Sequence, residues 1–216
     1  MTKKEIFKRY VLFIISLFFI ALGVAFTRRG ELGVSPISSV PNVLTYIYPS
    51  LSMGNWVIIW NCIMILGQIL ILRKQFQLIQ LLQIPLSFLF GYFTDFGMWC
   101  VSFIPNSFYP VKLMMVFTGV IILALGISLS VIANVIMNSG EAFVKTIADA
   151  VHKSFGNVKI CFDISCVLLS IILSLIFFHF KIVGAREGTV ISAVCTGFVV
   201  KFFQKKLDKP ISAILH

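Results

Sequence analysis

The amino-acid sequence predicts an all-α membrane protein with six transmembrane helices arranged as two inverted three-helix repeats. This fold class rests on the composition, on six long apolar segments and on an internal repeat. Hydrophobic residues make up 59% of the 216 positions and charged residues only 12%. A soluble domain of this length has too little interior to bury that much apolar surface. The composition therefore predicts that the chain lies in a bilayer.

Six segments are long and apolar enough for a helix that crosses the hydrocarbon core, which takes about 20 residues. In order along the chain they are 10–27, 54–72, 78–104, 113–134, 158–178 and 188–203. The first follows a short basic stretch and also resembles a signal peptide. Because the fourth segment carries a motif that matches the first, we expect the first to be retained as a helix.

The distribution of basic residues predicts the orientation in the membrane. With the N-terminus inside, 13 of the 18 Lys and Arg residues fall on the inner side. Basic residues concentrate in cytoplasmic loops, so both termini of this multi-pass protein are expected in the cytoplasm, at the plasma membrane. The net charge of +10 is explained by this topology. No basic soluble face is left for nucleic acid.

Short motifs recur at nearly constant spacing. ALGV at 21–24 returns as ALGI at 124–127, 103 residues later, and SMGN at 52–55 returns as SFGN at 154–157, 102 residues later. Gly91-x3-Asp95 corresponds to Gly197-x3-Lys201, 106 residues later. These motifs predict repeat one at about 9–104 and repeat two at about 112–207 within one transmembrane domain, 1–216. Three spans per half make the second half inverted, as in many secondary transporters.

The Gly-Asn pairs of the second motif are expected to mark a turn into a spanning helix in each repeat. Gly54 and Gly156 are predicted to allow the turn, and Asn55 or Asn157 to cap the helix that follows.

Each repeat also contains a short amphipathic segment, 35–48 in the first and 139–155 in the second. Ser35 is expected to cap the first segment, with Pro36 at its first helical position. Ser139 is expected to cap the second, followed by Gly140 and Glu141. These helices are either re-entrant or interfacial. If they are re-entrant, their N-termini offer free N–H groups to a solute, which makes Ser35, Pro36, Ser139, Gly140 and Glu141 candidate binding residues.

Four charged residues are further candidates for substrate binding. A charge within a span is costly unless paired or hydrated, so Asp95 and Asp163 are predicted functional groups, although Asp95 also fits a hydrated position near the outer interface. Arg28 and Arg29 form either an interfacial anchor or an electropositive entrance for an anionic solute.

Taken together, ELGVSPISSVPNVL, the SxGN motif, Gly91-x3-Asp95 and REGTVISAVCTGFVVKFF resemble the YczE/YyaS/YitT family of bacterial integral membrane proteins. The resemblance covers nearly the whole chain, with Gly188-Thr189 opening the last helix. Glu31-Leu32 stands where the family pattern has a further glycine. The resemblance implies a location in the bacterial cell membrane and a transport-related role.

These observations predict a small-solute secondary transporter or exporter that works by alternating access. One alternative is a substrate-binding subunit of an energy-coupling-factor importer. The small-residue motif Ala21-x3-Ala25 resembles the face by which such subunits couple to their partners. Another is a non-transporting assembly or regulatory protein. No catalytic pair, HExxH or phosphate-binding GxxxxGK[ST] motif is present, so we expect neither an enzyme nor a cofactor nor a metal. The expected partners are the lipid bilayer, a small solute of anionic character and, where small-residue faces permit, a second copy of the chain.

Overall fold

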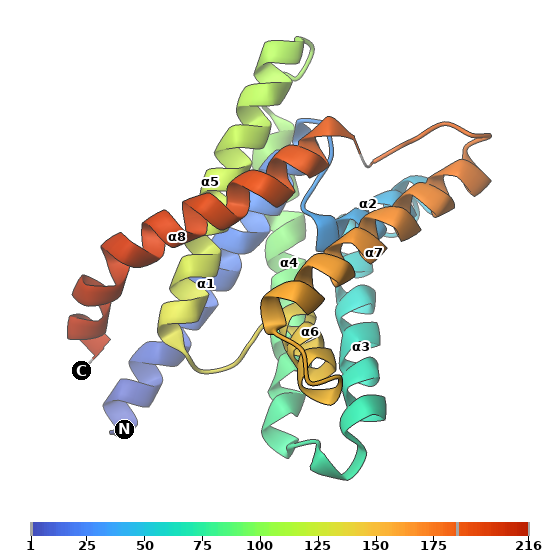
Figure 1. The fold of residues 1–216 in the computed structure, drawn as a ribbon. Helices are drawn as coiled ribbons and strands as arrows, with labels where there is room; N and C mark the ends of the chain where they lie inside the picture. Colours follow the sequence, from blue (N-terminus) through green and yellow to red (C-terminus); the bar gives the residue numbers. More distant parts are fainter. Residues whose placement is uncertain (1, 185, 216) are drawn as a thin grey trace. The chain divides into compact units, whose positions relative to one another are not determined.

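The computed structural model describes residues 2–184 and 186–215, and within these ranges the fold is helical throughout (Figure 1). Two short 3₁₀-helices, η1 (Arg73–Gln75) and η2 (Leu78–Leu82), connect two of the longer helices. The α-helices in these ranges are α1 (Lys3–Arg29), α2 (Pro36–Ile47), α3 (Met53–Leu72), α4 (Gln83–Ser102), α5 (Tyr109–Ala133), α6 (Ser139–Ala150), α7 (Phe155–Phe177) and α8 (Glu187–Leu215).

Five helical segments in the described ranges are long and apolar enough to cross a membrane: Lys3–Arg29, Met53–Gln75, Leu78–Ser102, Tyr109–Ala133 and Phe155–Phe177. The predicted segment 188–203 is helical as well, within α8. It is not among the five helical segments that are both long and apolar enough to cross a membrane. The chain thus has the helices of a multi-pass membrane protein, and the sixth crossing stays a prediction.

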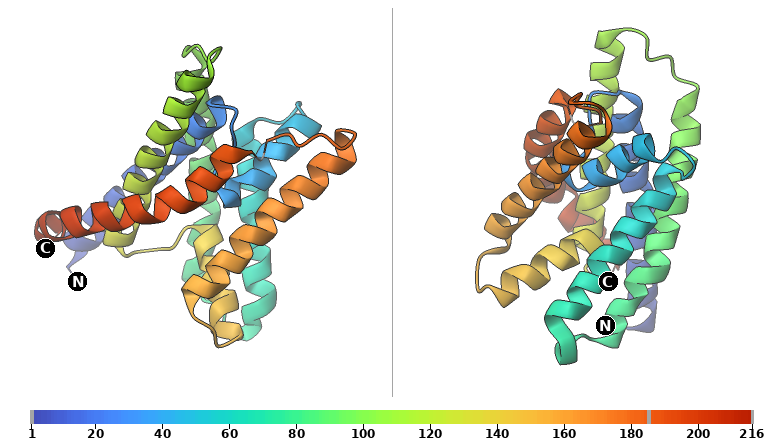
Figure 2. Two further views of the ribbon diagram at one scale, coloured as in Figure 1. Left: turned by 45° about the horizontal axis from the view of Figure 1, so that its top comes forward. Right: turned by 90° about the vertical axis from the view of Figure 1, so that its right-hand side faces the viewer.

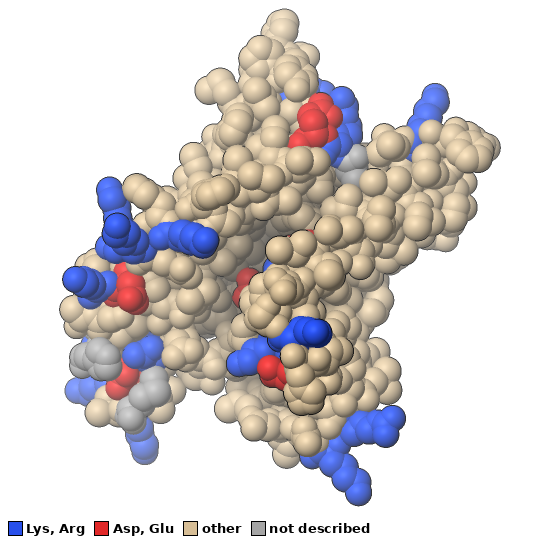
Figure 3. All heavy atoms as spheres, in the orientation of Figure 1, with Lys and Arg blue, Asp and Glu red and all other residues tan. Residues whose placement is uncertain are grey.

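The surface agrees with a membrane environment. Large apolar side chains project outward from the long helices; Leu70 is 73% exposed and Ile176 67% exposed. Figure 3 shows uncharged side chains over most of the visible surface, with lysines and arginines in small groups. Such broad apolar exposure is atypical of soluble monomers, and lipid is the expected solvent for it.

Helix boundaries recur with the spacing of the sequence motifs. The short helices α2 and α6 have 12 residues each and begin at Pro36 and Ser139, 103 positions apart. The long helices after them begin at Met53 and Phe155, 102 positions apart. The opposite orientation of the two sets of helices stays a prediction.

The described residues divide into two compact units, and each unit takes helices from both predicted repeats. Unit 1 comprises Met1–Ser35, Phe93–Ile136 and Arg186–His216, and unit 2 comprises Pro36–Tyr92 and Met137–Ala185. The units therefore do not coincide with the predicted repeats 9–104 and 112–207. The description as one transmembrane domain, 1–216, stays a prediction.

Unit 1 is built on the close packing of α1 against α5, which lie side by side in Figures 1 and 2. Glycines make this approach possible: a Cβ on Gly126 would lie 2.6 Å from the backbone nitrogen of Ile20. Helix α8 packs against α5, where the Ser128 hydroxyl donates to the Val200 carbonyl (3.2 Å). Small residues at helix contacts are typical of membrane proteins, where apolar lipid supplies no hydrophobic drive to associate.

The stretch before α2 lies on the N-terminus of α8 within the same unit. The Gly188 N–H donates to the Leu32 carbonyl (2.7 Å), and Gly33 lies against Thr189. Gly33 has φ 121°, a conformation that L side chains rarely adopt. Two stretches that carry the family resemblance thus meet in space.

The Ala21-x3-Ala25 face is used inside unit 1. Both alanines are completely buried. A Cβ on Gly97 of α4 would lie 3.1 Å from the Ala25 Cβ. This face packs within the chain, whereas a coupling face has to meet an ATPase partner; the importer alternative stays a prediction.

In unit 2, each short helix packs against both long helices. Helix α2 contacts α3 and α7, and α6 contacts the same two helices. The first part of α4 completes this unit: a Cβ on Gly91 would lie 2.8 Å from the Gly54 carbonyl oxygen, at the start of α3. Helices α2 and α6 are thereby enclosed by the long helices.

Candidate functional site at the junction of two short helices

The N-termini of α2 and α6 meet in unit 2. Ile37 and Gly140 are the second residues of their helices, and a Cβ on Gly140 would collide with the Ile37 side chain. The first turn of an α-helix has N–H groups without partners in the helix and carries a partial positive charge. Pro36, Ile37, Ser139 and Gly140, which we call the short-helix junction, therefore bring two positive helix ends together.

The start of α6 differs from the prediction by one residue. Asn138, not Ser139, is the cap: its side-chain oxygen accepts from the Ser139 N–H (2.9 Å). Ser139 is the first helical residue, and its hydroxyl pairs with that of Ser87 (3.0 Å). In the first segment, Pro36 opens the helix as predicted, and Ser35 directly before it is buried.

A buried polar network holds the start of α6 against α3 and α4. The amides of Gln68 and Gln83 form a reciprocal pair of hydrogen bonds, 3.0 and 3.1 Å long. Gln68 Nε2 also donates to the Ser139 carbonyl (3.2 Å). Gln68 is 0% and Gln83 3% exposed. Satisfied buried networks of this kind favour one arrangement of the helices, because any other leaves polar groups without partners.

Two other buried side chains fix α2 against the region of α7. The Ser39 hydroxyl donates to the Cys166 carbonyl (3.3 Å), and the Asn42 amide donates to the Gly184 carbonyl (2.8 Å). Both short helices are thus held by polar contacts as well as by packing. The position of the junction is therefore well defined within unit 2.

Three charged side chains adjoin the junction from α6 and α7. Lys159 and Asp163 form an ion pair one turn apart (2.5 Å). Glu141 is the third residue of α6 and interacts electrostatically with both of them. Burial raises the pKa of the Glu141 carboxyl; Lys159 lowers this pKa and Asp163 raises it. Glu141 and Asp163 are predicted site residues that the structure brings together, whereas the role of Lys159 was not predicted.

Glu141→Gln is expected to raise the melting temperature more at pH 8 than at pH 4.5. The pKa of Glu141 is higher in the folded state than its ordinary value of 4.5, so ionisation at higher pH opposes folding. Stability is therefore lost as the pH rises through the folded-state pKa, and a neutral amide removes that loss. Thermal unfolding of purified protein across this pH range measures the effect. Asp149→Asn, which removes an exposed carboxylate from the same helix, is the control. Parallel profiles of Glu141→Gln and the unmodified protein would contradict the prediction.

Arg28, Arg29 and Asp95 belong to unit 1, whereas the junction belongs to unit 2. The Arg29 guanidinium donates to the carbonyls of Ser102 (3.1 Å) and Ile104 (2.8 Å), so it caps the end of α4. Arg28 is half-buried in the last turn of α1. These positions favour the anchor interpretation of Arg28 and Arg29 over an entrance for anions. Asp95, also in unit 1, is partly buried in α4.

Glu31, which follows these arginines, forms an ion pair with Lys112 of α5 (2.6 Å). The hydrogen bond from Lys112 holds the pKa of the Glu31 carboxyl below its ordinary range. This acidic partner reduces the positive charge available near Arg28 and Arg29 and further supports the anchor interpretation.

The Gly-Asn pairs open helices, but the predicted turn and caps are wrong. The N-cap of α3 is Ser52, whose hydroxyl accepts from the Asn55 N–H (3.1 Å), and the N-cap of α7 is Ser154. Gly54, Asn55, Gly156 and Asn157 lie inside the first helical turn. The serine that opens each motif is the N-cap, so the helices begin three residues earlier than caps at Asn55 and Asn157 would have them.

Within residues 2–184 and 186–215, no group of three metal-ligating side chains occurs, and the five cysteines are free. The family model of a family of unknown function, DUF6198, matches residues 7–205. No curated protein and no solved structure matches the chain. No comparison ties it to the YczE/YyaS/YitT family, so that resemblance stays a prediction.

Proposed function

The chain belongs to DUF6198, a family of unknown function, and we propose that it is a small-solute secondary transporter or exporter. It works by alternating access of two inverted repeats in the plasma membrane, with both termini in the cytoplasm and with 188–203 as the sixth span. The short-helix junction carries this proposal. In transporters built from inverted repeats, solutes bind where interrupted helices present their N-termini near the middle of the membrane.

The pairing of helices within unit 2 supports the repeat. Helix α2 of the first half packs on α7 of the second, and α6 of the second half packs on α3 of the first. If the two halves of the chain are interchanged, the contact of α2 with α7 becomes the contact of α6 with α3. Together with the matching starts of these helices, this reciprocity is what a pseudo-two-fold axis through the junction produces.

The chemistry of the junction favours a solute with an anionic group. The partial positive charges of two helix N-termini favour a carboxylate or phosphate. Glu141 competes for the same partial charge when it is ionised and ceases to compete when it is protonated. Uptake of a proton by Glu141 would then accompany binding of the anion. Lys159 and Asp163 neutralise each other beside it, so the charge state of Glu141 controls the site.

A thermal-shift screen of the purified protein against carboxylates, phosphates, amino acids and vitamins tests the proposal. A ligand that binds only the folded protein raises the melting temperature by mass action. We expect a saturable shift from one anionic class, larger at low pH in the unmodified protein. Glu141→Gln is expected to bind with little pH dependence, while the control Asp149→Asn keeps the original dependence.

Uptake into proteoliposomes of the solute so identified then tests transport. A solute that raises the melting temperature but is not taken up in the presence of a proton gradient would favour the importer-subunit alternative. No shift from any compound, in protein that remains folded, would favour an assembly or regulatory role.

A further inference from the structure

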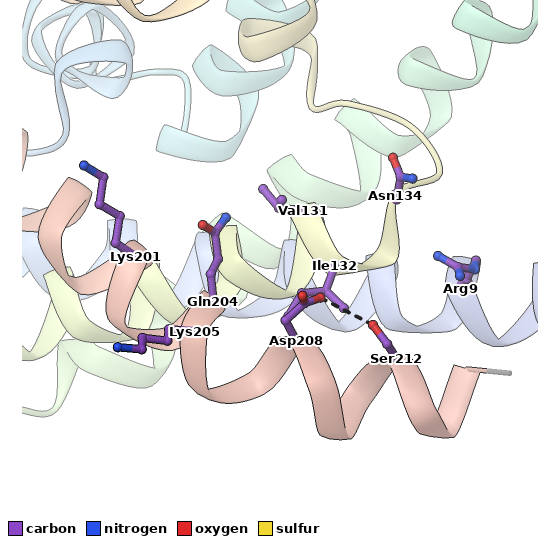
Figure 4. Close-up of a pocket in the computed structure, with 9 residues that line it drawn as sticks. All are labelled: Arg9, Val131, Ile132, Asn134, Lys201, Gln204, Lys205, Asp208 and Ser212. Atoms are coloured by element: carbon purple, nitrogen blue, oxygen red, sulfur yellow. Dashed lines mark hydrogen bonds between the residues drawn. The ribbon is translucent and has the colours of Figure 1, made fainter.

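A groove in unit 1, remote in sequence from the junction, has the properties of a lipid-headgroup site. The groove has a volume of about 590 Å³ and is bounded by α1, α5 and α8 (Figure 4). Its polar side chains include Arg9, Lys201, Gln204, Lys205 and Asp208, and Val131 and Ile132 of α5 also line it. The inference below does not depend on the proposed transport function.

The groove lies where three helices pass from apolar to polar sequence. Arg9 directly precedes the uncharged segment 10–27 of α1, and the apolar part of α5 ends at Ala133. Lys201 is the first charged residue of α8 after 188–200. Charged residues at the ends of apolar segments mark the level of the lipid headgroups. By the distribution of basic residues, this is the cytoplasmic leaflet.

The positive charge of Arg9, on the α1 side of the groove, is already neutralised within the protein. The Arg9 guanidinium is paired with the Glu5 carboxylate (3.1 Å) and donates to the Ala133 carbonyl (3.2 Å) at the end of α5. Its charge is therefore engaged in joining α1 to α5. The free positive charge of the groove comes from the α8 side.

Lys201 and Lys205 supply that charge from successive turns of α8. Both are exposed, and Gln204 between them offers an additional amide donor. The acidic residue of the groove, Asp208, accepts a hydrogen bond from Ser212 (3.3 Å). Figure 4 shows Asp208 and Ser212 farther along α8 than Lys201 and Lys205. Asp208 lies one turn beyond Lys205 and is engaged by Ser212, so two lysines face one carboxylate and the α8 side of the groove keeps a net positive charge.

The same part of α8 also has an apolar surface suited to lipid. Phe198 is 71% exposed and Phe202 54% exposed, and they precede Lys201 and Lys205 by one turn each. Aromatic residues beside lysines are typical of the membrane interface, where the rings contact acyl chains and the ammonium groups reach the phosphates.

We propose that this groove binds the phosphate of an anionic membrane lipid, with Lys201 and Lys205 as its ligands and Gln204 as a further donor. Basic pockets between transmembrane helices on the cytoplasmic side have the charge and shape to hold such headgroups. A neutral zwitterionic lipid lacks the net charge that two lysines select.

The test compares two double variants that change the same charge on the same helix. Lys201→Gln/Lys205→Gln removes the ligands. Lys206→Gln/Lys209→Gln is the matched control, since neither of those lysines lines the groove and Lys206 lies over the Phe202 ring (4.8 Å). Full-length protein is titrated with phosphatidylglycerol or phosphatidylcholine in mixed micelles, and bound lipid is counted by native mass spectrometry.

We expect the unmodified protein and the control to retain phosphatidylglycerol in preference to phosphatidylcholine. Lys201→Gln/Lys205→Gln is expected to bind phosphatidylglycerol at least about tenfold more weakly, with an unchanged melting temperature in phosphatidylcholine. Equal losses in both double variants would mean a general charge effect and would overturn the proposal. Competition by millimolar glycerol 3-phosphate as effective as that by the lipid would also overturn it, because the ligand would then be a soluble phosphate.

Discussion

Gly23→Ala is expected to destabilise the protein by about 1–3 kcal/mol and to lower its melting temperature, because it forces α1 away from α5. A Cβ at this position would lie 2.5 Å from the backbone nitrogen of Leu123 and 2.8 Å from the Gly119 carbonyl oxygen. Both obstacles are backbone atoms, so no side-chain rotation relieves the collision. The helices have to separate, and the loss of close packing extends beyond the substituted residue.

Gly197→Ala is the matched control for this experiment. It adds the same methyl group inside a long helix of the same unit, but apart from its chain neighbours and the backbone of its own helix no described atom lies within 4 Å of the new Cβ. Alanine has a higher helix propensity than glycine, so the control is expected to be neutral or stabilising by up to about 1 kcal/mol. Equal melting temperatures for Gly23→Ala and Gly197→Ala would show that α1 and α5 do not approach as closely as the structure has them.

The helical elements were largely predictable, since apolar length and capping residues are local properties. The end of α6 was not. Phe143, Ile147, Val151 and Phe155 recur at helical spacing and predicted a helix to 155, yet α6 ends at Ala150. Phe155 instead begins α7, after His152 takes a left-handed conformation with φ 54°. Apolar periodicity continues across this break, so the pattern alone could not locate it.

The N-cap of α6 could not be predicted from local sequence alone. Asn138 and Ser139 are adjacent, and both residue types are favourable caps. The structure assigns the role to Asn138, and the Ser139 hydroxyl pairs instead with Ser87 of α4. A contact between residues 52 positions apart is not encoded in local preference.

The candidate site was predictable in part. Pro36, Ser139, Gly140 and Glu141 were selected as helix starts, but their meeting at one junction depends on how α2 and α6 pack between α3 and α7. Gln83 had no sequence signal beyond being a polar residue beside an apolar run. Arg29 carries a charge that suits an anion, but in the structure it caps the end of α4. This role could not be predicted from the sequence, because it depends on the positions of the Ser102 and Ile104 carbonyls.

Gln68→Leu is expected to be the most destabilising substitution in unit 2. It leaves both polar atoms of the Gln83 amide without a partner in a buried setting, and it removes the second hydrogen bond of the Ser139 carbonyl, which stays bonded within α6. Each polar group left unpaired costs about 1–3 kcal/mol. Thermal unfolding measures the loss, with Gln77→Leu as the control because Gln77 is exposed in the loop before η2. A loss of stability in Gln68→Leu no larger than that in Gln77→Leu would contradict the hydrogen-bond network around Gln68.

The double variant Gln68→Leu/Gln83→Leu separates hydrogen bonding from packing. It removes both amides of the reciprocal pair, so fewer polar groups remain unpaired than in Gln68→Leu alone. We therefore expect the double variant to be more stable than the sum of the two single losses predicts, which is the signature of a direct interaction. Strictly additive losses would indicate that the amides are not paired. Because Gln68 also holds the Ser139 carbonyl, both variants are expected to loosen the short-helix junction and to weaken any ligand response there. Stability recovered in the double variant without recovery of ligand binding would then identify the Gln68–Ser139 contact as the one that positions α6 for the proposed solute.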